Sequence, residues 1–274
     1  MNYYKMLGMD REPFSTSPDP HFFYDSQEHK AALMRILIEV RLKRGLSVIM
    51  GDVGTGKTTL CRKLLQLFKE RENVEFYIIL DPAFKTEELF IECLIRTFGI
   101  TMEKEQPNIL DYKEAIKNFL YRKGVEENKT VVLLVDEAQK MDSSSLEVLR
   151  MLLNYETNEF KLLQLVLVGQ MELMVQLKSM RNFVDRIGLK YILNPFDIRE
   201  VKGMLDFRLK KAGYESHTDL FDPEAIEEIY KITQGYPRRV SMLCHNALRE
   251  LVITESKTVS YEIINKLVSK EVFI

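Results

Sequence analysis

A glycine-rich stretch at residues 51–59 has the composition of a phosphate-binding loop. It satisfies the pattern G-x-x-x-x-G-K-[ST], with an apolar segment before it and a helical pattern after it. Glycines let backbone N–H groups curl around phosphate oxygens, the lysine reaches the β- and γ-phosphates, and the threonine hydroxyl is a ligand for Mg²⁺. We therefore expect ATP to bind to a continuous run of residues: Gly51, Asp52, Val53, Gly54, Thr55, Gly56, Lys57, Thr58 and Thr59.

A pair of carboxylates ends the apolar segment at residues 131–135. Beside a phosphate loop, Asp136 is the expected partner of Thr58 in holding Mg²⁺, and Glu137 is placed to polarise a water for attack on the γ-phosphate. A small-molecule kinase needs a second substrate rather than an activated water. The pair therefore favours hydrolysis over transfer.

Polar and cationic residues after the next two apolar segments could also reach the nucleotide. Gln170 directly follows the segment at 164–169, where it could contact the attacking water or serve only as a helix cap. Arg181 and Arg186 precede the last segment, and Arg238 follows a Gly-x-Pro turn. Arginine suits a γ-phosphate because it is planar, always charged and multidentate.

Five short apolar segments are the expected strands that carry these residues. Because they are almost continuously apolar and alternate with helical periodicity, they predict a three-layer α/β core with a mostly parallel sheet. Four amphipathic segments then indicate a small helical domain. The expected strands are 46–50, 75–80, 131–135, 164–169 and 190–194, and the expected late helices are 197–213, 222–235, 237–256 and 260–272.

These patterns predict three parts of the chain. Residues 1–45 form a turn-rich lead-in and a helix that pack on the core, residues 46–196 form the nucleotide-binding core, and residues 197–274 form a helical lid.

The overall composition is that of a folded protein without a global basic field. Its 274 residues are 46% hydrophobic, and 39 Lys and Arg stand against 41 Asp and Glu, for a net charge of -2. No apolar run approaches the roughly 18 residues of a membrane helix. We therefore expect a cytoplasmic protein with no membrane span of its own.

Five blocks of the sequence, in order, resemble the ExeA-type AAA+ ATPases, the general secretion pathway protein A family. The blocks are "YYKMLGMDREPFSTSPDPHFFYDSQEHKAAL", "GDVGTGKTTL", "LLVDEAQ", "LLNYETNEFKLLQLVLVGQMEL" and "GYPRRVSMLCHNAL". The resemblance implies a P-loop NTPase core of the AAA+ type, with a five-stranded parallel sheet in the order 5-1-4-3-2 and a helical lid.

The resemblance also implies roles for three residues. Gln170 is similar to the sensor-1 position, Arg238 to the sensor-2 arginine, and Arg186 to the arginine finger that completes a neighbouring subunit's site. Arg181 remains the alternative finger, because "MRNFVDRI" departs from the family's usual L-R-Q-L-x-Q-R-I. Secretion-type members also continue into a membrane span and a periplasmic part, which this sequence does not contain.

The sequence thus predicts an ATPase that works as an ATP-stabilised homo-oligomer. Its client would be a protein of a membrane-associated assembly machinery, of the secretion, pilus or polysaccharide-export type. One alternative is a DNA-binding regulator of the transposition type, with basic clusters at 41–45, 208–213 and 236–240 facing duplex DNA. A nucleotide switch with little hydrolysis is a third hypothesis, and the intact Asp136 and Glu137 speak against it.

Overall fold

The chain is described as a computed structural model that covers residues 2–15, 17, 19–102, 104–215 and 219–269. Its contacts divide the chain into two compact units. Among the described residues, the helical unit contains those of 1–27, 53–59 and 194–274, and the sheet unit contains those of 28–52 and 60–193. No helix among the described residues is long and apolar enough to cross a membrane.

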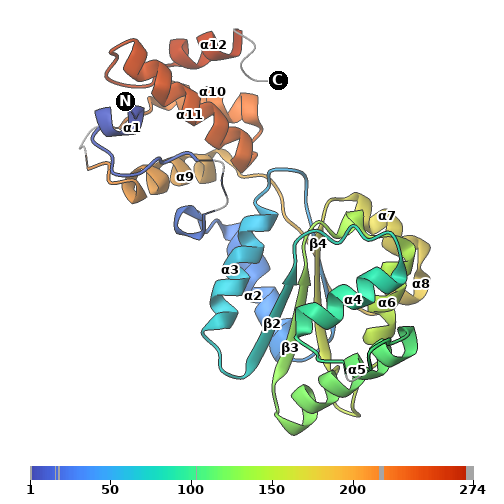
Figure 1. Cartoon of the computed structure of the whole chain (residues 1–274). Coiled ribbons are helices and arrows are strands. Elements are labelled where there is room, and N and C mark those ends of the chain that lie inside the picture. The colour runs from blue at the N-terminus through green and yellow to red at the C-terminus, as the bar shows by residue number, and fades with distance from the viewer. Residues whose placement is uncertain (1, 16, 18, 103, 216–218, 270–274) are drawn as a thin grey trace. The chain divides into compact units, whose positions relative to one another are not determined.

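A five-stranded parallel sheet forms the centre of the sheet unit, in the order β2-β3-β4-β1-β5 (Figure 1). This is the predicted order, and the expected parallel α/β fold is confirmed. Residues 46–50, 131–135 and 163–169 are buried throughout, as expected for strands covered on both faces. The strands are β1 (Leu46–Met50), β2 (Val74–Ile79), β3 (Thr130–Val135), β4 (Leu163–Gly169) and β5 (Ile187–Ile192).

Helices cover both faces of this sheet. One face packs against α4, α5, α6 and α7 in a hydrophobic core that contains Leu133, Leu165 and Leu167, and α2 and α3 lie on the other side (Figure 1). The helices along this part of the chain are α2 (Gln27–Arg41), α3 (Lys57–Lys69), α4 (Glu87–Phe98), α5 (Ile109–Tyr121), α6 (Ser143–Leu152), α7 (Glu172–Ser179) and α8 (Arg181–Val184). Two short turns of other helix types are the π-helical η2 (Arg122–Glu126) and the 3-10 helix η3 (Ala138–Lys140).

The last strand starts three residues earlier than predicted, at Ile187 instead of residue 190. β5 is an edge strand, so its exposure alternates and it includes the exposed Gly188 and Lys190, which break the apolar run. Its outer residues contact α2, where the Tyr191 hydroxyl donates to Oε2 of Glu28 at 2.9 Å. The continuous apolar pattern therefore located only the second half of this strand.

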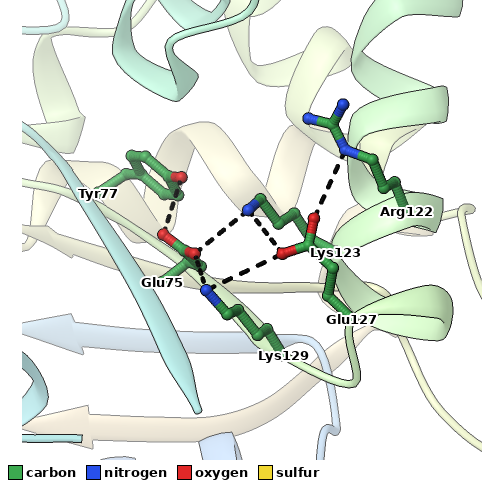
Figure 2. Close-up of polar contacts among 6 residues, drawn as sticks. All are labelled: Glu75, Tyr77, Arg122, Lys123, Glu127 and Lys129. Carbon is green, nitrogen blue, oxygen red and sulfur yellow. Dashed lines mark hydrogen bonds and ion pairs between the residues drawn. The ribbon is translucent and has the colours of Figure 1, made fainter. Parts of the chain in front are cut away.

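The opposite edge strand, β2, carries a cluster of ion pairs close to its start (Figure 2). Glu75 accepts hydrogen bonds from Nζ of Lys129 at 2.7 Å and from Nζ of Lys123 at 3.3 Å. Lys123 lies in η2 and also pairs with Glu127 at 2.8 Å, and the Tyr77 hydroxyl donates to Glu75 at 3.4 Å. Charged side chains of this kind discourage pairing of an open sheet edge with another chain.

The helical unit has a hydrophobic core of its own. It includes residues of four late helices together with Met9, Phe14 and Phe22 from the N-terminal segment. Phe14 is fully buried and meets the ring of Phe221 edge-on at 6.0 Å. The elements are α1 (Tyr3–Met6), η1 (Pro20–Phe22), α9 (Ile198–Lys211), α10 (Pro223–Thr233), α11 (Pro237–Ile253) and α12 (Tyr261–Ser269).

The observed units divide the chain differently from the three predicted parts. The lead-in joins the late helices because its buried apolar side chains belong to their core, whereas residues 28–45 join the sheet. Three of the late helices begin with common helix start signals. Asp197 and Glu200 form a capping box at α9, and proline occupies the first position of α10 and α11.

Candidate functional site

The phosphate-loop pattern lies between β1 and α3, the strand and helix that it requires. Gly54 and Gly56 have φ values of +89° and +95°, which side chains rarely tolerate. Lys57, Thr58 and Thr59 form the first turn of α3, where the unpaired N–H groups of a helix favour an anion. The local backbone therefore fits a triphosphate.

The helical unit places the start of α11 against this loop. The backbone N–H of Arg238 donates to the carbonyl oxygen of Gly54 at 3.2 Å, and a Cβ on Gly54 would lie 3.1 Å from Cβ of Arg238. Among the described residues, no hydrogen bond or ion pair of the Arg238 guanidinium is present. This arginine is therefore next to the loop with its charge available, whereas Arg239 stacks on the ring of Tyr236 at 5.0 Å.

The carboxylates follow β3 at the carboxyl edge of the sheet. Asp136 is buried, at 2% exposure, and its N–H donates to the carbonyl oxygen of Ile79 at 2.8 Å. Oδ1 of Asp136 accepts from the N–H of Glu137 at 2.9 Å. Glu137 has a φ of +53°, a left-handed conformation that is uncommon for a side chain of this size and that concentrates at functional sites.

A glutamine that the sequence analysis did not single out connects Glu137 to the next strand. Nε2 of Gln139 donates to Oε2 of Glu137 at 2.8 Å, and Oε1 of Gln139 accepts from the N–H of Gln170 at 3.0 Å. Gln170 is thus joined to the carboxylate through its backbone, because the amide of Gln139 bridges the ends of β3 and β4. The position of Gln139 two residues after Glu137 was the sequence signal that could have identified it.

The beginning of the phosphate loop lies at the same edge. The N–H of Gly51 donates to the carbonyl oxygen of Gly169 at 3.2 Å, and Gly169 directly precedes Gln170. Gly51, Gln170 and Glu137 are therefore connected by a short line of hydrogen bonds within the sheet unit. This is the carboxyl edge of parallel strands, where such sheets bind ligands.

The two candidate finger arginines lie before β5. Nη1 of Arg186 is 3.4 Å from the carbonyl oxygen of Arg150, a long contact at the limit of a hydrogen bond. Arg181 begins α8, and its side chain lies outside the described residues. The contacts within one chain therefore leave both arginines as predictions for a neighbouring subunit.

The basic clusters expected on a DNA-binding face have different surroundings. Arg208 is half-buried, and its Nη1 donates to the Ser15 carbonyl oxygen at 3.3 Å and to Oγ of Ser241 at 3.1 Å. Partial burial lowers its pKa to about 10. Nζ of Lys43 lies 3.9 Å from the centre of the Phe160 ring. Arg208 therefore connects the lead-in to α11 and uses part of its guanidinium within the chain.

The protein family described as "AAA domain" matches residues 40–177, about half of the chain. General secretion pathway protein A of Aeromonas hydrophila is 34% identical over 248 residues, which is 90% of this chain and 44% of that protein. The chain thus spans less than half the length of this relative.

Solved structures with the same fold have much lower identity. The Aeropyrum pernix ORC2 protein, in ADPNP–ADP complexes, has a TM-score of 0.63 at 19% identity and covers 95% of this chain and 71% of its own. Cdc6p from Pyrobaculum aerophilum has a TM-score of 0.67 at 18% identity and covers 96% and 71%. At such identities the likeness supports the fold alone.

Proposed function

Because the chain belongs to the ExeA-type AAA ATPases, we propose that it binds Mg²⁺-ATP and hydrolyses it to ADP and phosphate. The observation that carries this proposal is the hydrogen-bonded line from Gly51, where the phosphate loop starts, through Gln170 and Gln139 to Glu137. It joins a phosphate-binding element to a carboxylate that can accept a proton. A loop of this kind without such a base would support nucleotide binding but not hydrolysis.

The donor set fits the nucleotide and its metal. The N–H groups of residues 51–59 would hold the phosphates, Lys57 would pair with the β- and γ-phosphates, and Thr58 and Asp136 offer the hard oxygen ligands that Mg²⁺ prefers. When bound, Mg²⁺ supplies positive charge that offsets the charge of the phosphate oxygens.

Glu137 is the proposed general base. A water oxygen forms a bond to the γ-phosphorus, the bond between that phosphorus and the β–γ bridging oxygen breaks, and Glu137 takes the water proton. Gln170 and Arg238 are proposed to contact the γ-phosphate region as the two sensors. In support of this, both have backbone contacts that connect them to the loop: Arg238 to Gly54, and Gln170 through its neighbour Gly169 to Gly51.

The energy of ATP hydrolysis is proposed to drive assembly of a larger, membrane-associated machine, because the similar protein from Aeromonas hydrophila bears a secretion-pathway name. Arg186 of one subunit would complete the site of the next in an ATP-stabilised homo-oligomer. An arginine finger is worth about 10³-fold or more in rate, so an isolated subunit should turn over slowly.

The test is phosphate release per subunit over a wide range of protein concentration, with Lys57→Ala as the control that cannot hold the phosphates. We expect turnover to rise steeply with concentration and to vanish in Lys57→Ala. A wild-type chain with no phosphate release at any concentration would contradict the hydrolysis proposal. A rate that is high and independent of concentration would contradict the oligomer.

The DNA-binding alternative has less support, because its three basic clusters belong to two different units. Residues 41–45 belong to the sheet unit, and residues 208–213 and 236–240 belong to the helical unit, where Arg208 is half-buried and bonded to Ser15 and Ser241. Retention on duplex DNA with ATP, lost steeply as salt rises, would favour this alternative.

A further inference from the structure

The amide of Gln139 occupies a position between the proposed base and the end of β4. Its Nε2 is 2.8 Å from Oε2 of Glu137, and its Oε1 is 3.0 Å from the backbone nitrogen of Gln170. Among the described residues, no hydrogen bond to the second carboxylate oxygen of Glu137 is present. One oxygen of the base is therefore held while the other stays available for a water proton.

The orientation of this amide follows from the chemistry of its partners. The backbone N–H of Gln170 can only donate, so it requires the oxygen of the Gln139 amide. The nitrogen of that amide must then face Glu137, whose ionised carboxylate can only accept. A side-chain amide offers one donor group and one acceptor group side by side, and asparagine, the other amide, is one methylene shorter.

Three elements fix where Gln139 lies. It belongs to η3, its carbonyl oxygen accepts from Nε2 of Gln176 in α7 at 2.9 Å, and its amide lies against Gly169 of β4. A Cβ on Gly169 would come within 2.9 Å of Oε1 and 3.3 Å of the backbone nitrogen of Gln139. A glycine at this position leaves room for the glutamine amide, and a side chain there would require that amide to shift.

The hydrogen bond between Gln139 and Glu137 differs from an ordinary ion pair because its donor is uncharged. A lysine or arginine in place of Gln139 would bind Glu137 more strongly and would hold it as a neutralised carboxylate. A neutral amide orients the carboxylate through a hydrogen bond to one oxygen and places no positive charge beside it. Such support by a neighbouring group is typical of residues that must remain reactive.

We infer that Gln139 is the positioning residue of Glu137, and that it makes the reactive placement of this base depend on the end of β4. The inference rests on the proposed hydrolysis of ATP. Gly51 at the start of the phosphate loop is hydrogen-bonded to Gly169, so a displacement of the loop is transmitted through β4 and Gln139 to the carboxylate. Gln139 acts only through Glu137 and does not itself touch the phosphates.

The first experiment compares ATP affinity with turnover in Gln139→Glu and Gln139→Leu. The glutamate keeps an acceptor for the N–H of Gln170 but replaces the donor to Glu137 with a second carboxylate, and the leucine removes both bonds. We expect kcat to fall by about 10- to 100-fold in each, because small displacements of a catalytic group cost rates of this order. The dissociation constant for ATP should stay within about threefold of wild type, as expected when only a transition-state interaction is lost.

Gln106→Glu is the matched control, since Gln106 is exposed and lies in a loop outside the site. It adds the same charge and should leave kcat, ATP affinity and the melting temperature unchanged. Thermal melting of all variants separates loss of folding from loss of positioning. If Gln139→Glu melts like wild type and also turns over like wild type, the inference is overturned.

The second experiment combines Gln139→Leu with Glu137→Gln and measures single-turnover cleavage of ATP. If Gln139 acts through Glu137, the double variant should be no slower than Glu137→Gln alone. Multiplied losses would overturn the inference by indicating an independent role. If Glu137→Gln itself turns over at the wild-type rate, the proposed function fails together with the inference. A dead Glu137→Gln beside an unaffected Gln139→Glu rejects only the inference.

Discussion

Two glutamates of the sheet unit, Glu75 and Glu137, have opposite surroundings. Glu75 lies near the start of β2 between two lysines, and its hydrogen bond with Lys129 and the charge of Lys123 lower the pKa of its carboxyl (Figure 2). Glu137 follows β3 at the other end of the sheet, in a left-handed conformation, and its carboxylate contacts a neutral amide.

The contrast indicates what each carboxylate can do. Oε1 of Glu75 pairs with both Lys123 and Lys129, and Oε2 accepts from the Tyr77 hydroxyl, which suits a structural role at the sheet edge. Glu137 is held at one oxygen by a neutral amide, in a backbone conformation that is maintained at a cost of the order of 1 kcal/mol. Substitution of Glu75 should therefore affect the free energy of unfolding, and substitution of Glu137 or its neighbours should affect turnover.

The largest effect is expected from Asp136→Asn. Asp136 is buried beside Glu137 and is the proposed metal ligand, so loss of its charge should lower turnover by about 100-fold or more and raise the Mg²⁺ concentration needed for half-maximal rate. Titration of phosphate release with Mg²⁺ measures both. An unchanged Mg²⁺ dependence would remove Asp136 from the metal site.

Two arginines of the helical unit extend the same contrast. Arg208 is half-buried and bonded to Ser15 and Ser241, whereas the guanidinium of Arg238 has no such contact among the described residues. Arg238→Ala should therefore reduce the preference for ATP over ADP by about 10- to 100-fold, since a charge-assisted hydrogen bond contributes about 1.5–3 kcal/mol.

Competition binding of ATP and ADP measures this preference, with Arg239→Ala as the control. Equal losses of ATP and ADP affinity in Arg238→Ala would contradict the sensor role, and so would a larger loss of preference in Arg239→Ala.

Two strand glycines offer a matched pair of smaller changes. A Cβ on Gly169 would meet Oε1 of Gln139 at 2.9 Å, and a Cβ on Gly188 would meet Oε2 of Glu39 at the same distance. Gly169→Ala should lower kcat by about tenfold because it displaces Gln139 from Glu137. Gly188→Ala should melt at a lower temperature but keep wild-type turnover, and equal turnover in the two variants would break the comparison.

Glu75→Gln should have the smallest effect, a loss of about 1 kcal/mol in the free energy of unfolding with no change in turnover. The folded state lowers the pKa of Glu75 below its ordinary value of 4.5, so its contribution is present above that pH and is lost as pH falls below it. Urea denaturation at pH 7 and pH 3 measures this. The difference in free energy of unfolding between wild type and Glu75→Gln should shrink at pH 3, and a constant difference would contradict the structural role of Glu75.

The buried strands were predictable because a continuous apolar run needs two covered faces, and β1 starts and ends at the predicted residues. The edge strand β5 was only half predicted because its exposure alternates. The lead-in was assigned to the core because periodicity gives the period of a helix but not the partner of its apolar face. Met9 and Phe14 instead lie in the core of the late helices.

The residue types of the candidate site could be predicted from motifs, but their connections could not. The spacing after β3 placed Asp136 and Glu137 at the end of a strand, whereas the left-handed backbone of Glu137 and its bond to Gln139 depend on a neighbouring strand. Arg208 was expected on a basic surface because three cationic residues are close in sequence, whereas it bonds to Ser15, which is 193 residues away.

The most direct test of the account compares wild type with Glu137→Gln in two measurements on the same sample, ATP binding and phosphate release. The substitution keeps the shape of the side chain and removes its basicity, so we expect ATP affinity within about threefold of wild type and turnover reduced by about 100-fold or more. Phosphate release at the wild-type rate with ATP fully bound would contradict the assignment of Glu137 as the base, and with it the proposed mechanism.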